Sequence, residues 1–242
     1  MLDHINLEKV LFLDIETVPQ HASYSELDDG WRELWDKKAG IINRGFVPTE
    51  DDPEEIYQRA GIYAEFGKIV CISVGLLRGS GSQRRLRLKS FAGDDEKQLL
   101  QDFANLLNSH YNSQDNYLCA HNGKEFDFPY IARRMLINNL RLPLQLDIAG
   151  KKPWEIRHLD TMELWKFGDF KSFTSLSLLA KAFGIPTPKD DIDGSDVWRV
   201  YWRDRDVDRI VTYCQKDVMA LAQLLLRYRG EALLSEDEVT VV

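Results

Sequence analysis

The feature that most constrains the fold is a short apolar run near the start of the chain. Residues 8–16 read Glu-Lys-Val-Leu-Phe-Leu-Asp-Ile-Glu, which is too short for a typical helix and is apolar at both odd and even positions. A strand with two apolar faces is buried on both sides, as in the centre of a sheet covered by helices. We therefore predict a central strand that Pro19 ends, within a layered α/β fold.

Apolar patterns further along the chain alternate between strands and helices. Residues 69–77 predict a second strand, and a Gly-Ser turn leads to residues 84–91, whose alternating Leu and basic residues predict an edge strand. The other predicted elements are a helix capped by Asp94 or Asp95 and running to about His110, a strand over 117–120, a helix opening at Phe128-Pro129, a strand over 157–162, and helices over 176–183 and 206–229. Their order predicts one mixed sheet with an antiparallel meander at one side and parallel strands at the other.

The chain reads as a single domain, residues 1–242, with one long excursion. Residues 20–66 form a polar insertion between the first two strands, with helical signals that include a predicted helix start at residues 52–55. An insertion of this length either overhangs a site or is a surface excursion with its own apolar cluster. Residues 231–242 read as a tail.

Composition excludes several classes of protein. A net charge of −8 excludes the strongly basic class that coats nucleic acid. The apolar runs are far shorter than the roughly 20 residues that cross a bilayer, and the first residues lack a secretory signal. Three separated cysteines, Cys71, Cys119 and Cys214, argue against a disulfide framework and a zinc site. We therefore expect a cytoplasmic protein with no membrane partner.

Acidic residues follow the first strand and recur at two later positions. Asp14 and Glu16 are two apart, so both carboxylates project from one face at the end of the strand, either as half of a divalent-metal site or as a solvated strand end. Asp127 follows the 117–120 strand and is expected on the same rim, as a ligand or as the N-cap of the next helix. Tyr213 and Asp217 lie on one face of the last helix. Either both face that rim, or the pair is a chance feature of an amphipathic helix without a role in a site.

Taken together, these groups resemble the three motifs of the DEDD superfamily of 3′–5′ exonucleases. The matching segments are Asp14-Ile15-Glu16-Thr17, Asn122-x3-Phe126-Asp127 and Tyr213-x3-Asp217. The tyrosine is typical of the DEDDy branch, since the DEDDh branch has a histidine where this chain has Thr212. Within that branch the chain is similar to the exonuclease domain of family B DNA polymerases and to the stand-alone predicted 3′–5′ exonucleases related to it. The resemblance implies a ribonuclease H-like fold, with a five-stranded mixed sheet flanked by helices.

The resemblance also implies a hydrolytic mechanism with two divalent metal ions, Mg²⁺ or Mn²⁺. It assigns Asp14 to both metals, Glu16 and Asp217 to the metal on the nucleophile side, Asp127 to the other metal, and Tyr213 to the orientation of the attacking water. Four carboxylates at close range cannot all stay ionised without compensation, and hard oxygen ligands favour Mg²⁺ or Mn²⁺ over zinc. The expected products are nucleoside 5′-monophosphates.

Further residues are candidates for substrate binding. Thr17 and Asn122 are expected to contact substrate or to cap their own turns. Phe126 either contacts substrate or packs in the core. Asp160 either lies at the substrate, fixes a motif residue from outside, or is a solvated strand end.

Basic and aromatic residues suggest a path for the strand. A local phosphate track or plain solvated charges are the alternatives for Lys124, Arg133, Arg134, Lys151 and Lys152. Stacking on bases or core packing are the alternatives for Phe167, Phe170 and Phe173.

The expected function is hydrolysis at the 3′ ends of single-stranded DNA, with a polymerase or repair protein acting in trans as a candidate partner. The alternatives are an exoribonuclease of the same mechanism and a catalytically silent nucleic-acid-binding module. Few residues follow Arg229, so we expect no polymerase module and no proofreading in cis. The sequence does not determine the oligomeric state.

Overall fold

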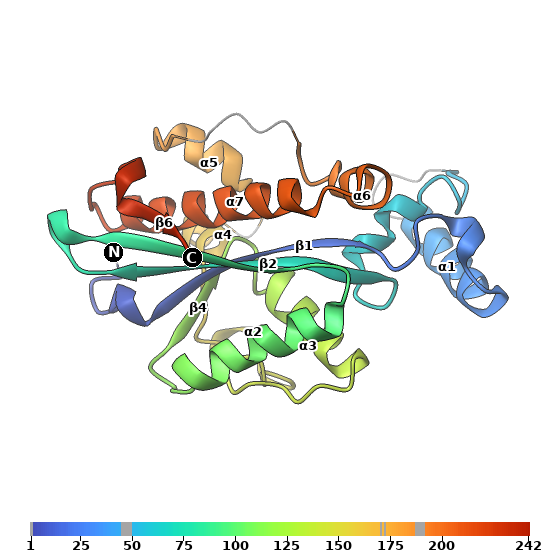
Figure 1. The fold of residues 1–242 in the computed structure, drawn as a ribbon, viewed down its shortest axis with the longest axis horizontal. Helices are drawn as coiled ribbons and strands as arrows, with labels where there is room; N and C mark the ends of the chain where they lie inside the picture. Colours follow the sequence, from blue (N-terminus) through green and yellow to red (C-terminus); the bar gives the residue numbers. More distant parts are fainter. Residues whose placement is uncertain (1, 45–49, 170, 172, 187–191) are drawn as a thin grey trace.

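A twisted sheet lies between two layers of helices in the computed structural model, which describes residues 2–44, 50–169, 171, 173–186 and 192–242. Helices α5, α6 and α7 lie on one side of the sheet and α2 and α3 on the other (Figure 1). The strands are β1 Val10–Pro19, β2 Gly67–Arg78, β3 Arg85–Ala92, β4 Tyr117–Ala120, β5 Leu159–Asp160 and β6 Val239–Val241. The helices are α1 Asp29–Asn43, α2 Glu96–His110, α3 Asp127–Ile137, α4 Thr161–Lys166, α5 Leu176–Ala182, α6 Val197–Arg199 and α7 Val207–Tyr228. The mixed α/β fold class is therefore confirmed.

The strand order is β5-β4-β1-β2-β3-β6. β2 pairs antiparallel with β1 and with β3, whereas β4, β5 and β6 join by parallel pairing. The expected count of five strands was wrong for the described residues, which form six. The difference is β6, because the tail turns back and pairs with residues 86–88 of β3. The expected edge strand β3 is therefore an edge over only part of its length.

Two other expectations need correction. The strand predicted over 157–162 is only two residues long, because the Asp160 carboxylate accepts hydrogen bonds from the backbone N–H groups of Met162 and Glu163 and so starts α4. The helix predicted at residues 52–55 is a turn, and the 3-10 helix η3 (Tyr57–Ile62) follows it. Elsewhere the predicted boundaries hold within a few residues; Asp95, for example, caps α2.

The alternation of side chains along β1 decides where its acids point. Val10 and Phe12 belong to the apolar cluster formed with α7, and Leu11 and Leu13 to the cluster formed with α2 and α3. Because side chains alternate along a strand, the even-numbered acids that follow continue on the α7 face.

Residues 20–44 and 50–66 form a small layer of their own around Trp35, which is fully buried. Its buried neighbours are Leu27, Ala39, Ile56, Tyr57 and Ala60. Figure 1 shows α1 at one end of the molecule, beyond the ends of β1 and β2.

Hydrogen bonds anchor this insertion and the end of β1 to the rest of the chain. On the outgoing side, the indole N–H groups of Trp198 and Trp202 donate to the carbonyls of Ala22 and Pro19, at 3.2 and 3.1 Å. On the returning side, Tyr130 Oη donates to Gly61 O at 2.6 Å, and Arg134 Nη1 donates to Ala64 O at 2.8 Å. Both ends of the insertion are therefore fixed beside the end of β1.

None of the helices in the described part of the chain has both the length and the apolar character needed to cross a bilayer.

Candidate active site

Two carboxylates from β1 form the base of the site. Asp14 and Glu16 lie on the strand face that points to α7, and Glu16 is only 7% exposed. One ligand atom each from Asp14, Glu16 and Cys214 lie within 4.8 Å of one another. Three potential ligand atoms at this spacing can hold a single cation.

Helix α7 adds a phenol and a fourth acid. Tyr213 and Asp217 lie one turn apart, and Tyr213 is hydrogen-bonded to the Asp217 carboxylate. Asp217 is close enough to raise the pKa values of both Asp14 and Glu16. The apolar side of α7 packs on β1 and β2. This packing brings Tyr213 and Asp217, in the first half of the helix, toward the acids of β1.

Asp127 comes to the same place from the other side of the sheet. It is the first residue of α3, and Phe126 holds the N-cap position, so the N-cap alternative for Asp127 was wrong. Its side chain is 3% exposed. Burial is the largest cause that raises the pKa of Asp127, to about 7. Hydrogen bonds from its own backbone and from the backbone of Ile15 act in the opposite direction and lower the pKa. The hydrogen bond with the backbone of Ile15 places Asp127 next to β1, and its charge acts more strongly on Asp14 than on Glu16.

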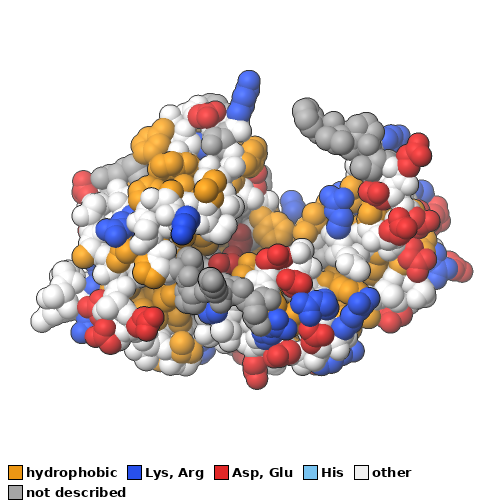
Figure 2. All heavy atoms as spheres, turned by 90° about the horizontal axis from the view of Figure 1, so that it is seen from above, with side chains coloured by type: hydrophobic (Ala, Val, Ile, Leu, Met, Phe, Trp, Pro, Cys, Tyr) orange, Lys and Arg blue, Asp and Glu red, His pale blue; other side chains and the backbone are white. Residues whose placement is uncertain are grey.

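The electrostatics of this group favour a bound cation. Burial is the largest cause that raises the pKa of Asp14 well above its usual range, and the neighbouring charges of Asp127 and Asp217 follow. The pKa of Glu16 is raised for the same reason, with Asp14 as the first charged contributor. In the space-filling view a notch separates the lobe at the right from the rest of this face, and acidic side chains lie at its base (Figure 2).

The loop before Asp127 is held from beneath by Asp160. The carboxylate of Asp160 accepts hydrogen bonds from the backbone N–H groups of Asn122 and Lys124, at 3.0 and 3.1 Å, in addition to those that start α4. With 3% exposure, Asp160 supports the loop, and its assignment to substrate binding stays a prediction. Asn122 has a φ of 63°, and its buried Oδ1 atom has no hydrogen-bond partner among the described residues.

Thr17 and Phe126 line a cavity of about 450 Å³ next to Glu16. The Thr17 side chain is hydrogen-bonded to Tyr130, and Phe126 packs against the same tyrosine with ring centroids 5.4 Å apart. The wall opposite β1 comes from the insertion (Gln58, Arg59, Gly61 and Ile62) and from Gly194, Ser195 and Trp198. Part of the insertion is therefore a wall of the site.

Two cysteines at the site were not expected from the sequence. Cys214 Sγ donates to Asp14 Oδ2 at 3.4 Å, and Cys71, which is paired with Glu16 across β1 and β2, is hydrogen-bonded to Cys214. All three cysteines are free and buried. The position of Cys214, directly after Tyr213, was a usable signal for its place at the site. Cys71 carries no comparable signal, because only the strand register brings it near.

The basic candidates separate into two groups. Arg134 is 4% exposed and forms a bidentate ion pair with Glu96 at 2.8 and 2.6 Å, so the phosphate-track alternative is wrong for this residue. Lys124 and Lys151 line a cavity of about 460 Å³ that also includes Asn122 and Lys166.

Aromatic side chains stand exposed near these lysines. Phe167 is 76% exposed, Phe173 69% and Trp154 78%, so core packing was the wrong alternative for the two phenylalanines. Phe170 lies outside the described residues. The Lys152 and Lys166 ammonium groups lie over the rings of Trp154 and Phe173, at 5.2 and 4.6 Å from their centroids.

The donor set fits hard divalent cations. Four carboxylates from β1, α3 and α7 converge, and their charges add to burial in raising the pKa values of Asp14 and Glu16. Carboxylate oxygens suit Mg²⁺ and Mn²⁺.

Comparison with known proteins gives one match to a family. The family is described as "Predicted 3'-5' exonuclease related to the exonuclease domain of PolB", and it matches residues 62–238. The matched stretch contains Asp127, Tyr213 and Asp217 and begins after the two acids of β1. No curated protein matches the sequence.

Solved structures of other proteins also align with this chain. The family B DNA polymerase of the hyperthermophilic archaeon Pyrobaculum calidifontis aligns over 90% of this chain at 15% identity with a TM-score of 0.48, and the chain spans 24% of that polymerase. The RNase domain of the yeast Pop2 protein aligns over 96% of this chain and 81% of its own length, at 12% identity with a TM-score of 0.43.

Proposed function

The chain belongs to the family of predicted 3′–5′ exonucleases related to the exonuclease domain of PolB, and we propose that it removes nucleotides from the 3′ ends of single-stranded DNA by metal-dependent hydrolysis. The observation that carries the proposal is the convergence of four carboxylates and one tyrosine from β1, α3 and α7. A catalytically silent binding module has no need of these acids, because without a cation their mutual repulsion destabilises the fold.

The two cations would be held by Asp14, Glu16, Asp127 and Asp217. When bound, they would supply a nucleophilic hydroxide and stabilise the leaving 3′ oxygen. Asp14 has both Asp127 and Asp217 as charged neighbours, which suits a residue shared by both metals. The products are nucleoside 5′-monophosphates.

Tyr213 orients the reacting water by accepting a hydrogen bond from it, because its own hydroxyl proton is donated to Asp217. Burial and the nearby carboxylates raise the pKa of Tyr213 above its usual value, so the phenol keeps its proton at neutral pH. A protonated phenol is not a general base. The proton of the water therefore leaves by another route, and Tyr213 acts by position.

The terminal nucleotide fits the cavity between β1, η3 and residues 194–198. Its volume of about 450 Å³ is within the range of small-ligand sites. Glu16, Thr17, Ile62 and Phe126 line it, so a base would contact the apolar side chains of Ile62 and Phe126 while its phosphate faces the acids. Arg59 is exposed on the same wall and offers a positive charge to the phosphate.

Lysines and exposed aromatic rings next to the site support a single-stranded substrate. Lys124, Lys151 and Lys166 share a cavity with Asn122, and the exposed rings of Trp154 and Phe173 lie under neighbouring ammonium groups. Unpaired bases can stack on exposed aromatic rings, and lysines can contact the phosphates of the same strand. The bases of a duplex are already paired and stacked, so a duplex end has less use for exposed rings. A polymerase or repair protein in trans remains a candidate partner.

The test is a time course on 5′-labelled single-stranded DNA and on RNA of the same sequence, with Mg²⁺, Mn²⁺ or EDTA. We expect a ladder that shortens from the 3′ end, requires metal, and is absent for Asp14→Asn. Faster cleavage of RNA would move the assignment to an exoribonuclease. Identical traces for wild type and Asp14→Asn on both strands would leave the silent binding module as the better account.

A further inference from the structure

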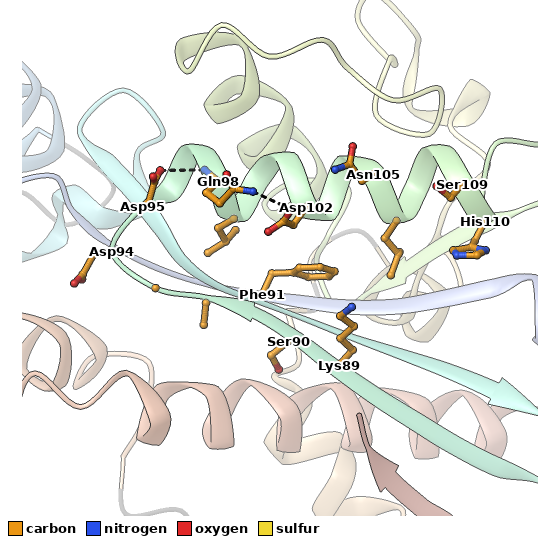
Figure 3. Close-up of a pocket in the computed structure, with 14 residues that line it drawn as sticks. Lys89, Ser90, Phe91, Asp94, Asp95, Gln98, Asp102, Asn105, Ser109 and His110 are labelled. Carbon is orange, nitrogen blue, oxygen red and sulfur yellow. Dashed lines mark hydrogen bonds between the residues drawn. The ribbon is translucent and has the colours of Figure 1, made fainter.

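A larger cavity lies away from the site, along the outer edge of the sheet. It has a volume of about 740 Å³ and is bounded by residues 89–95 on one side and by α2 on the other (Figure 3). Lys89 and Phe91 extend toward α2, whereas Ser90 extends toward α7, where Gln215 Nε2 donates to its hydroxyl at 2.9 Å. Helix α2 contributes Gln98, Asp102, Asn105 and Ser109, spaced three or four residues apart on one face.

The strand that borders this cavity presents unpaired backbone. Gly93 N–H donates inward to Val70 O, and Leu88 O accepts outward from Val242 N–H. Because successive residues of a strand alternate between its two neighbours, the N–H and C=O groups of Ser90 and Ala92 point outward. β6 pairs only with residues 86–88, and no strand of the described chain pairs with the outer side of residues 89–92.

The cavity is negatively charged at the end near Ala92. Three exposed carboxylates line it, those of Asp94, Asp95 and Asp102. Their hydrogen-bond donors are neutral: Tyr201 Oη for Asp94, and the backbone and side-chain amides of Gln98 for Asp95 and Asp102. Asp94 also lies near the ammonium group of Lys68, so the charge that is open to an incoming cationic group is that of Asp95 and Asp102.

We propose that this groove docks an extended, basic segment of a partner protein, which adds as a strand to residues 89–92 in line with β6. The pairing of β6 on the same edge shows that the edge accepts a strand. Alternate side chains of an added strand point to α2, where lysine or arginine residues meet Asp95 and Asp102. The acidic wall disfavours phosphate, so the groove is separate from the nucleic-acid path.

The test begins with a phage-displayed library of random octapeptides selected on the immobilised full chain. Enriched peptides are synthesised with a fluorophore, and their affinity is measured by fluorescence anisotropy for wild type, Ala92→Pro and the matched control Ala92→Val. Proline removes the outward N–H and is tolerated on the free side of an edge strand, whereas valine keeps that donor. We expect lysine- or arginine-rich peptides that bind Ala92→Pro about tenfold more weakly and Ala92→Val like wild type.

Two further measurements keep the proposal falsifiable if Ala92→Pro does not fold. The double variant Asp95→Asn, Asp102→Asn retains a helix cap, because asparagine also caps, and is expected to bind the same peptides more weakly. Amide hydrogen exchange is expected to slow at Ser90 and Ala92 when peptide is bound. Selection of non-basic peptides, equal affinity for the double variant, or unchanged exchange at both amides would overturn the proposal.

Discussion

At the scale of single residues, the site contains two kinds of group: carboxylates that would bind metal, and side chains that orient other groups. Asp14 is surrounded by Asp127, Asp217 and the thiol of Cys214. Tyr213 stands at the rim of this group and donates to Asp217. Substitutions at the two kinds of residue therefore have different costs.

Asp14→Asn is expected to abolish measurable hydrolysis, whereas Tyr213→Phe is expected to lower kcat by about tenfold, which is less than a general acid or base contributes. The reason is that the asparagine removes a shared metal ligand, while phenylalanine removes only an orienting hydroxyl. Single-turnover rates at saturating Mn²⁺ measure both. A Tyr213→Phe variant as inactive as Asp14→Asn would contradict a purely positional role.

Asp160→Asn is expected to lower the free energy of unfolding by about 1–3 kcal/mol, because backbone N–H groups that now share two carboxylate oxygens would face an amide NH₂. Urea denaturation measures the loss. Glu163→Gln is the matched control, since its exposed carboxylate only pairs with Lys124 and should shift stability by less than about 1 kcal/mol.

At the scale of elements, the insertion is fixed to the site by its returning segment. Tyr130 links Thr17 on β1 to Gly61 in η3, and Arg134 links Glu96 on α2 to Ala64. These contacts make η3 a wall of constant position next to Glu16.

Tyr130→Phe is expected to raise KM for single-stranded DNA several-fold with a smaller change in kcat, because η3 loses its bond to α3 while the acids keep their places. Tyr24→Phe is the control, since it removes a hydroxyl that bonds Asp36 within the insertion. Initial rates across substrate concentrations distinguish the two variants. Equal effects on KM would show that η3 does not contact the substrate.

Local sequence patterns predict the long elements and the acid motifs. The features that these patterns do not predict depend on contacts between residues far apart in the sequence. The helical period of apolar residues over 206–229 and the apolar run of residues 10–13 are local signals. The structure has the helix α7 and the strand β1 at these places. β6 is three residues long, and its pairing with β3 spans about 150 positions, a distance at which no local pattern exists. The contact of Cys71 with Cys214 depends on the same kind of long-range register. The roles of Asp14, Glu16, Asp127, Tyr213 and Asp217 stay predictions.

At the scale of the whole molecule, the acids link stability to pH and metal. The carboxyl groups of Asp14, Glu16 and Asp127 have raised pKa values in the folded state. The stability that a raised carboxyl pKa contributes is complete below the unfolded value, about 3.9 for Asp, and is lost as pH rises through the folded value. For Asp127 the loss ends near its folded pKa of about 7.

Without metal, the melting temperature is therefore expected to fall as the pH rises from 5 to about 7.5, and Asp127→Asn should flatten this fall. Mn²⁺ should restore stability most strongly at the upper end of that range, since it binds the ionised acids. Calorimetry in EDTA and in Mn²⁺ measures both. A melting temperature that rises with pH in EDTA would contradict the electrostatic account.

The crowding of two glycines where the insertion returns to the sheet has a consequence for recognising related sequences. A Cβ atom at Gly67 would overlap Tyr130 Oη and Gly61 O, and one at Gly61 would lie 3.0 Å from the backbone of Val18. No other residue fits position 67 while Tyr130 keeps its bond, and a side chain at position 61 would require the backbone of Val18 and Pro19 to shift. A chain that shares this wall should therefore carry the spacing Gly-x5-Gly before its second strand and a tyrosine three residues after the third acid, a signature independent of the catalytic residues.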